Sequence, residues 1–279
     1  MQHKLSRMNR KYIYIILVIT ITSTLYFTEK YVDRKNEDYP NTSKVKGTTT
    51  SIEFDDTYYP TTTTGVIIEH AYYHLSYAEK HEQAEWVAYE MKKSQLSQNE
   101  IKRPYFVEDR DVKSGSADWR SYKNSGYDRG HLCPAADRKF DYDAFHETFL
   151  TSNISPQNRQ FNGGIWNRLE QKVRFWAKKY DGVFVITGGV LKNGLPAIGD
   201  DRVSVPEEFY KIVVDASGDE LKAVAFLIPN KGTDASFYDF AVTIDQIEAK
   251  TGIDFFPALP NSEEKKLEAT VNLKAWGKR

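Results

Sequence analysis

The sequence predicts an α+β domain with a central mixed or antiparallel sheet, because strand patterns and helix patterns both occur after residue 65. A continuous apolar run at 183–186, followed shortly by two glycines, is typical of a strand buried on both faces. An apolar stripe at helical spacing precedes this run, and a turn-like segment joins two later strand patterns. With 279 residues, the chain can form one large or two small domains with a sizeable core.

Four segments carry strand patterns. They lie at 86–91, 183–187, 209–215 and 221–228. The last two flank residues 216–219, Ala-Ser-Gly-Asp, which form a plausible hairpin turn. These two strands are therefore expected to pair with each other.

Two segments carry helix patterns, at 164–179 and 243–250. In the first, four apolar residues fall on one side of a helix: Trp166, Leu169, Val173 and Trp176. In the second, Thr243 and Gln246 have capping-box spacing, and Gly252 follows as a stop signal. Strand patterns on both sides of the first helix favour the α+β arrangement.

The N-terminus, residues 1–30, is predicted to be a membrane anchor or a signal helix. An apolar run at 12–27 follows four basic residues, a pattern that orients the N-terminus inside and the rest outside. The run lies near the lower limit of the roughly 17–25 residues that span a bilayer, and no clear cleavage site follows it. We therefore favour an uncleaved anchor, with the domain exported. A cleaved segment would make the protein secreted or periplasmic.

Residues 31–64 are polar and rich in threonine, without helical or strand periodicity. They are predicted to form a flexible stalk. The folded domain is then expected at 65–279.

Charge limits how nucleic acid could be bound. The chain has 38 basic and 39 acidic residues, a net charge of −1, whereas proteins that bind nucleic acid by bulk charge are strongly basic. Any such role must depend on a local patch. One basic stretch lies at 150–180, where Glu170 is the only acidic residue. A solvated helix face explains this stretch equally well.

The tetrapeptide Asp128-Arg129-Gly130-His131 is the strongest indication of function. Hydrolysis of a phosphodiester requires a proton acceptor for water, positive charge beside the phosphorane and a proton for the leaving oxygen. His131 suits the first task, because its ordinary pKa of about 6.5 leaves much of it neutral at pH 7. Gly130 removes a side chain beside it, so backbone or substrate can approach closely.

Asn162 is the expected metal ligand, since Mg²⁺ prefers oxygen donors and keeps several waters. Capping the following helix is its alternative role. Glu170 lies eight residues later, within about 80° of Asn162 around a helix, and could orient a metal-bound water. An ion pair with Arg174 at i+4 explains Glu170 equally well.

Two arginines could contact phosphate. Arg129 adjoins the candidate base, although a buried bridge between Arg129 and Asp128 is the preferred role for Asp128. Arg103 is a further candidate for stabilising the phosphorane.

Two other features predict no chemistry. His70 and His74 have i, i+4 spacing but lack the glutamate of a zinc-protease motif. Cys133 is the only cysteine, so no intrachain disulfide exists, and a buried thiol is expected.

Three stretches resemble one nuclease family. They are Tyr-Asp-Arg-Gly-His-Leu-Cys-Pro-Ala-Ala-Asp at 127–137, Ser-Asn-Ile-Ser-Pro-Gln at 152–157 and Phe-Asn-Gly-Gly-Ile-Trp-Asn-Arg-Leu-Glu at 161–170. They are similar to the DNA/RNA non-specific endonuclease family, which are ββα-metal (His-Me finger) nucleases similar to endonuclease G. Weaker similarity covers nearly the whole domain after the stalk.

The resemblance implies a ββα-metal fold, with His131 as proton acceptor and Asn162 as the direct ligand of Mg²⁺, which Mn²⁺ could replace. It also implies supporting roles for Glu170, Asn153 and Gln157. We place Arg168, from the basic stretch, in the same supporting group.

The family's upstream arginine corresponds loosely to Arg103, with Arg110 and Arg120 as rivals. We therefore predict a metal-dependent endonuclease that cuts DNA and RNA with little sequence preference. Contacts mainly to phosphate would explain that lack of preference. A cell-surface nucleotide phosphodiesterase and a non-catalytic nucleic-acid-binding surface protein are the alternatives, and the near-zero net charge favours the former.

Overall fold

The computed structural model describes residues 14, 20–24, 56–97, 99–217 and 221–277, and divides the chain into units Met1–Lys44 and Val45–Arg279. In the first unit the described residues are helical. Within the described part of the chain, no helix has the length and apolar character needed to cross a bilayer. Most of the predicted anchor at 12–27 and of the stalk lies outside the described residues, so membrane attachment and export stay predictions.

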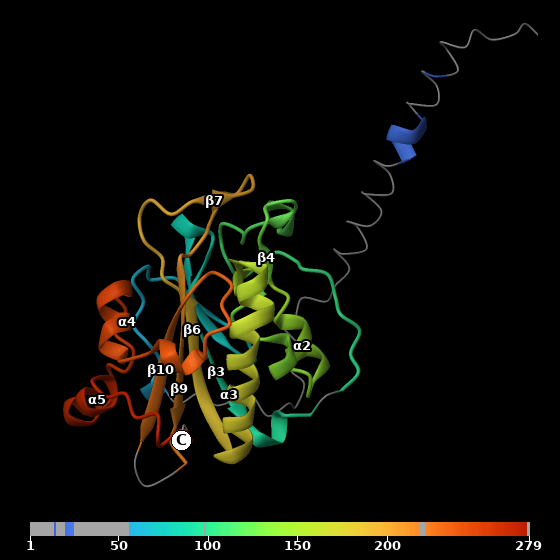
Figure 1. Cartoon of the computed structure of the whole chain (residues 1–279). Helices are drawn as coiled ribbons and strands as arrows, with labels where there is room; N and C mark the ends of the chain where they lie inside the picture. Colours follow the sequence, from blue (N-terminus) through green and yellow to red (C-terminus); the bar gives the residue numbers. More distant parts are fainter. Residues whose placement is uncertain (1–13, 15–19, 25–55, 98, 218–220, 278–279) are drawn as a thin grey trace, which may run out of the picture. The chain divides into compact units, whose positions relative to one another are not determined.

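A seven-stranded antiparallel sheet forms the centre of the second unit (Figure 1). Its strands, in spatial order, are β1 (Ile67–Glu69), β2 (His74–Ala78), β3 (Gln83–Lys92), β6 (Gly182–Gly189), β9 (Glu208–Asp215), β10 (Lys222–Pro229) and β11 (Ala241–Val242). All four predicted strands are confirmed, and β9 and β10 pair as a hairpin. The short strands β1, β2 and β11 carry too few residues to show periodicity.

Alternating side chains of the strands bury both faces of the sheet. On β3, Val87 and Tyr89 belong to one core cluster, whereas Trp86 and Ala88 belong to the other. Figure 1 shows α2 (Tyr142–Glu147) and α3 (Asn167–Lys179) on one side, and α4 (Ile244–Thr251) and α5 (Asn261–Glu268) on the other. The α+β prediction is therefore confirmed, with an antiparallel sheet.

The two predicted helices differ in accuracy. Thr243 caps α4 in a capping box with Gln246, and Gly252 ends the helix at φ 73°, as expected. In contrast, α3 begins at Asn167 rather than at residue 164. A wide turn of π type, Phe161–Trp166, precedes it, and Gly164 interrupts this turn with φ −102° and ψ −108°.

A separate two-stranded ribbon precedes α3 in the chain. It consists of β4 (Asp128–His131) and β5 (Ile154–Gln157), with His131 opposite Ile154. A second small pair consists of β7 (Ala197–Ile198) and β8 (Val203–Ser204).

Distant residues hold the β4–β5 ribbon in place. The Ser155 hydroxyl donates to Gln83 Oε1 at 2.5 Å, and Gln83 Nε2 donates to the Ser204 carbonyl at 2.6 Å. Asn230 Nδ2 donates to the Pro156 carbonyl at 3.1 Å. The ribbon is therefore tied to the main sheet from two sides.

The folded part begins before residue 65. Trp86 Nε1 donates to the Thr61 carbonyl at 2.9 Å, and the Thr63 N–H donates to Glu85 at 2.9 Å. The end of the predicted stalk therefore packs against β3.

Candidate active site

His131 ends β4 in an aromatic cage. Its ring lies 5.5 Å from that of Phe106 and 5.0 Å from that of Phe149, centre to centre. Nε2 is enclosed, and no described residue forms a hydrogen bond with it. Burial, with the nearby Arg103 guanidinium, lowers the pKa of His131 to about 3. The imidazole is therefore neutral across the physiological pH range.

Gly130 leaves room for a neighbouring side chain rather than for substrate. A Cβ atom at this position would lie 2.1 Å from Cδ of Gln157 on β5. Neither polar atom of the buried Gln157 amide has a hydrogen-bond partner among the described residues. An unpaired buried amide is costly, so Gln157 is a group with spare hydrogen-bonding capacity beside Gly130.

A ladder of alternating guanidinium groups and aromatic rings extends from the His131 cage. Arg103 Cζ lies 5.4 Å from the centre of the Phe149 ring and 5.6 Å from that of Phe106. Arg129 Cζ lies 4.9 Å from Phe106 and 5.7 Å from Trp119, and Arg120 follows at 5.3 Å from Trp119.

Ion pairing distinguishes the three arginines that were candidates for contacting the phosphorane. Arg103 and Arg129 form no ion pair with a described residue, whereas Arg120 pairs with Asp118 at 2.6 Å. The structure thus brings Arg103 beside His131. Arg110 belongs to no described ring contact or ion pair. Stacking on the rings holds the guanidinium groups of Arg103 and Arg129 in place, and their charge is not neutralised by a carboxylate.

Asp128 binds residues other than the predicted one. Its carboxylate accepts from Arg159 Nε at 3.2 Å and from Asn162 Nδ2 at 3.3 Å. The predicted bridge to Arg129 is wrong, because successive side chains on a strand point to opposite faces. Asn162 is thereby joined to β4.

Asn162 keeps a free oxygen. It lies in the wide turn before α3 and caps no helix, since α3 has no side-chain cap. With Nδ2 facing Asp128, Oδ1 accepts no hydrogen bond from a described residue. Amide and carboxylate oxygens are donors that Mg²⁺ prefers. Asn162 and Asp128 therefore fit a hard divalent cation.

Glu170 lies on the first turn of α3, beside buried charges. Its predicted partner, Arg174, binds Asp137 instead, with Nη1 at 2.7 Å from Oδ1. Burial raises the pKa of Glu170 to about 7, and Lys211 opposes that rise. The helical-wheel relation to Asn162 does not apply, because the wide turn separates the two residues.

Two predicted residues hold the backbone rather than facing His131. Asn153 Oδ1 accepts from the Cys133 N–H at 2.8 Å, while Nδ2 donates to the carbonyls of Cys133 at 3.0 Å and Thr148 at 2.9 Å. Arg168 Nη2 donates to the Ala235 carbonyl at 3.1 Å. Asn153 therefore positions the segment that follows His131, and Arg168 holds a distant loop.

The other predicted features are structural. Burial raises the pKa of the Cys133 thiol to about 12, so it is inert, as expected. His70 is buried, with Nε2 2.8 Å from Asp109 and Nδ1 3.8 Å from Asp111. Burial opposes a charged His70, but the hydrogen bond and charge of Asp109 prevail and raise its pKa. No motif in the sequence indicated this pairing, which joins residues 39 apart.

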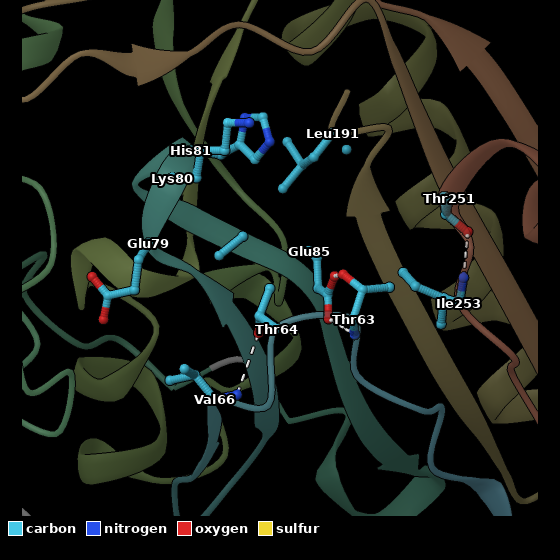
Figure 2. Close-up of a pocket in the computed structure, with 12 residues that line it drawn as sticks. Thr63, Thr64, Val66, Glu79, Lys80, His81, Glu85, Leu191, Thr251 and Ile253 are labelled. Atoms are coloured by element: carbon cyan, nitrogen blue, oxygen red, sulfur yellow. Dashed lines mark hydrogen bonds between the residues drawn. The ribbon is translucent and has the colours of Figure 1, made fainter. Parts of the chain in front are cut away.

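A pocket of about 350 Å³ lies apart from these residues (Figure 2). Its lining includes Glu85, Thr63 and His81. Glu85 accepts from the Thr63 N–H at 2.9 Å and from the Ser76 hydroxyl at 2.6 Å. His81 Nδ1 lies 2.9 Å from the Ser204 hydroxyl. The main polar groups that line the pocket thus form hydrogen bonds within the protein, so the pocket is not the candidate site.

Comparison with known proteins identifies one family. The model of the DNA/RNA non-specific endonuclease family matches residues 51–262. The mitochondrial nuclease EXOG of Danio rerio is 35% identical over 206 residues, 68% of this chain and 60% of that protein. Nuclease C1 of Cunninghamella echinulata var. echinulata is 32% identical over 212 residues, 69% of this chain and 83% of that protein.

The fold is also similar to a solved structure. A chain of the EndoG/EndoGI complex superposes with a TM-score of 0.66 and 29% identity, covering 71% of this chain and 88% of that one. The match to EXOG of Homo sapiens, at 31% identity, spans 56% of that protein. The chain thus spans less than two thirds of the length of these EXOG relatives.

Proposed function

This chain belongs to the DNA/RNA non-specific endonuclease family, and from that premise we propose that it is a metal-dependent endonuclease of ββα-metal architecture. It hydrolyses phosphodiester bonds of DNA and RNA with little sequence preference. One observation carries the proposal: the neutral, unpaired imidazole of His131 lies beside the unpaired guanidinium of Arg103. An imidazole without a hydrogen-bond partner can accept a proton from water, and an adjacent guanidinium without an ion pair can bind phosphate.

His131 acts as the general base. Because Nε2 is enclosed by the aromatic cage, we assign proton uptake from water to Nδ1. A base with a pKa of about 3 is weak in the free enzyme. An anionic phosphate beside Arg103 would offset that guanidinium's charge and strengthen the base. The site therefore becomes more basic when it holds its substrate.

The Arg–aromatic ladder binds the substrate backbone. Arg103 and Arg129 provide permanent positive charge for phosphate, and neither reads a base edge. Trp119, which is half-buried, offers a ring on which a base could stack. Phosphate contacts with sequence-tolerant stacking account for low sequence preference despite a net charge of −1.

Asn162 Oδ1, supported by Asp128, would hold the cation, with Mg²⁺ as the expected ion and Mn²⁺ as a substitute. When bound there, a divalent cation would neutralise charge on the phosphorane and supply an acidic water for the leaving oxygen. Glu170 orients groups around that position. Asp128 also keeps the Asn162 amide nitrogen turned away, so that the oxygen is presented.

The test is digestion of supercoiled plasmid and of RNA by the full chain. Wild type, His131→Ala and Asn162→Ala are compared with Mg²⁺ and with chelator. We expect cutting of both substrates that stops with chelator and falls by about 10²–10⁴-fold in His131→Ala. Binding without cutting would indicate a non-catalytic binding protein. Cleavage of small phosphodiesters alone would indicate a nucleotide phosphodiesterase, with binding that depends little on salt.

A further inference from the structure

Lys211 is a buried lysine that the proposed mechanism does not use. It lies on β9, near the middle of the sheet, and is fully buried. Its Nζ has no hydrogen-bond partner among the described residues and lies 4.8 Å from the centre of the Trp166 ring. A lysine is almost never fully buried unless a charge compensates it. A charged Lys211 therefore needs a nearby anion.

Two carboxylates lie near enough to stabilise the Lys211 ammonium. Burial has the largest influence and lowers the pKa of Lys211, while Glu170 and then Asp137 oppose that fall and Arg174 adds to it. Glu170 follows Trp166 by one helical turn, so the indole and the carboxylate lie over the same part of β9. The buried Lys211 and Asp137 thus form a charge cluster of two cations and two anions with the half-buried Arg174 and Glu170.

Within this cluster Asp137 is already satisfied. It accepts from Arg174 Nη1 at 2.7 Å and from the Tyr89 hydroxyl at 3.0 Å. Glu170 has no hydrogen bond or ion pair with any described residue. Lys211 is therefore the cation left to balance Glu170.

We propose that Lys211 is a positioning residue, whose buried ammonium keeps the Glu170 carboxylate ionised beside the Asn162 turn. This inference deepens the proposed function and depends on it. If Lys211 lost its charge, two carboxylates would share one guanidinium. Glu170 would then take up a proton, because Asp137 holds both Arg174 and Tyr89. A protonated Glu170 orients water and charge poorly.

Electrostatics around Glu170 agree with this geometry. Burial is the main cause that raises its pKa, Asp137 adds to the rise, and Lys211 and then Arg174 oppose it. Tyr89 and Cys133 face the same cluster, and burial keeps both of them protonated. Lys211 therefore makes the largest contribution that favours the carboxylate.

The decisive experiment is a double-mutant cycle between Lys211→Met and Glu170→Gln, followed as plasmid cleavage from pH 6 to 9. Alone, Lys211→Met should lower the rate at pH 7 by about 10–100-fold, with part of the loss recovered above pH 8. In the Glu170→Gln background it should change the rate by less than about threefold. An equal loss in both backgrounds, or an unshifted pH profile, would overturn the proposal.

Lys222→Met is the matched control. Lys222 Nζ also lies over an aromatic ring, 3.7 Å from the centre of Tyr180, and pairs with a carboxylate, Asp215, at 2.9 Å. It lies outside the charge cluster, so its loss should leave the pH profile unchanged. Lys211→Arg, which keeps the charge, should retain the wild-type profile.

A measurement on the wild type covers the case in which Lys211→Met does not fold. Carbon-13 NMR follows Glu170 Cδ, assigned with Glu170→Gln, and Lys211 Cε, assigned with Lys211→Arg. We expect the lysine signal to stay constant while Glu170 titrates. Deprotonation of Lys211 at a lower pH than Glu170 would overturn the proposal even if the wild type cuts. A wild type that does not cut would instead refute the proposed function alone.

Discussion

Two histidines, His131 on β4 and His70 just after β1, lie in opposite electrostatic surroundings. Rings and an arginine surround His131, and its pKa falls to about 3, mainly through burial. Carboxylates surround His70, and despite burial Asp109 raises its pKa. Burial alone does not decide what a histidine does. The sign of the neighbouring charge favours the neutral form of His131 and the charged form of His70.

The two histidines also differ in whether their polar atoms have hydrogen-bond partners. The cage of His131 leaves Nε2 without a partner, which is unfavourable for folding. The pocket of His70 is fully paired, since Asp109 also accepts from the Ser152 hydroxyl at 2.5 Å. The unpaired Nε2 is a cost of the cage, whereas the paired atoms around His70 stabilise the fold.

The largest effect is expected from substituting His131, and it should fall on the cleavage rate. His131→Leu should lower the plasmid-cutting rate by about 10²–10⁴-fold. Its free energy of unfolding should stay within about 1 kcal/mol of wild type or rise, because an unpaired polar group leaves an apolar cage. Rates measured with urea unfolding check both parts. A large loss of stability would contradict the description of the cage.

The converse substitution, His70→Ala, should act on stability. Removing His70 leaves the buried Asp109 carboxylate without its partner, which costs about 3–5 kcal/mol. Cutting per folded molecule should stay near wild type. Urea unfolding and active-site-normalised rates measure the two quantities. Loss of activity in fully folded His70→Ala protein would show that the two regions are coupled.

A smaller effect is expected from Gly130→Ala beside the base. The new methyl would overlap the Gln157 side chain, so we expect a cost of about 1–3 kcal/mol. Gly163→Ala is the control, because a Cβ there meets nothing within 4 Å. Thermal unfolding compares them, and Gln157→Ala should restore much of the loss. Equal costs for both glycine variants would rule out the overlap.

The smallest effect is an opposite pH dependence of stability. His131, with a lowered pKa, contributes stability above pH 6.5 that is lost as the pH falls toward 3. His70, with a raised pKa, contributes stability below pH 6.5 that is lost as the pH rises through its folded value. Relative to wild type, His131→Leu should therefore gain stability at low pH, and His70→Ala should lose more there. Urea midpoints from pH 5 to 8 test the two signs.

Local signals in the sequence predicted much of this molecule. The apolar run of β6 and the capping box of α4 each depend on adjacent residues, and each lies where expected. The early start assigned to α3 has a local cause too, because Gly164 permits a turn that periodicity does not reveal.

Contacts between distant segments could not be predicted. Asp128 pairs with Arg159 and not with its neighbour, and Arg174 prefers the buried Asp137 to the carboxylate one turn away. The Arg–aromatic ladder gathers side chains from two loops, the 3-10 helix Trp119–Tyr122 and strand β4. Which partner a charged side chain binds depends on which charges are buried and on which face of a strand each side chain lies. The spacing of residues in the sequence gives neither piece of information.

The ties between the β4–β5 ribbon and the rest of the fold bear on folding order. Ser155 is hydrogen-bonded to Gln83, 72 residues before it, and Pro156 is hydrogen-bonded to Asn230, 74 residues after it. Contacts over such separations form late, because long loops must close first. A chain that has collapsed around β9 and β10 would still lack an ordered site. We expect refolding chains to regain tryptophan burial before cutting activity, so the proposed nuclease would stay inactive until its fold is nearly complete.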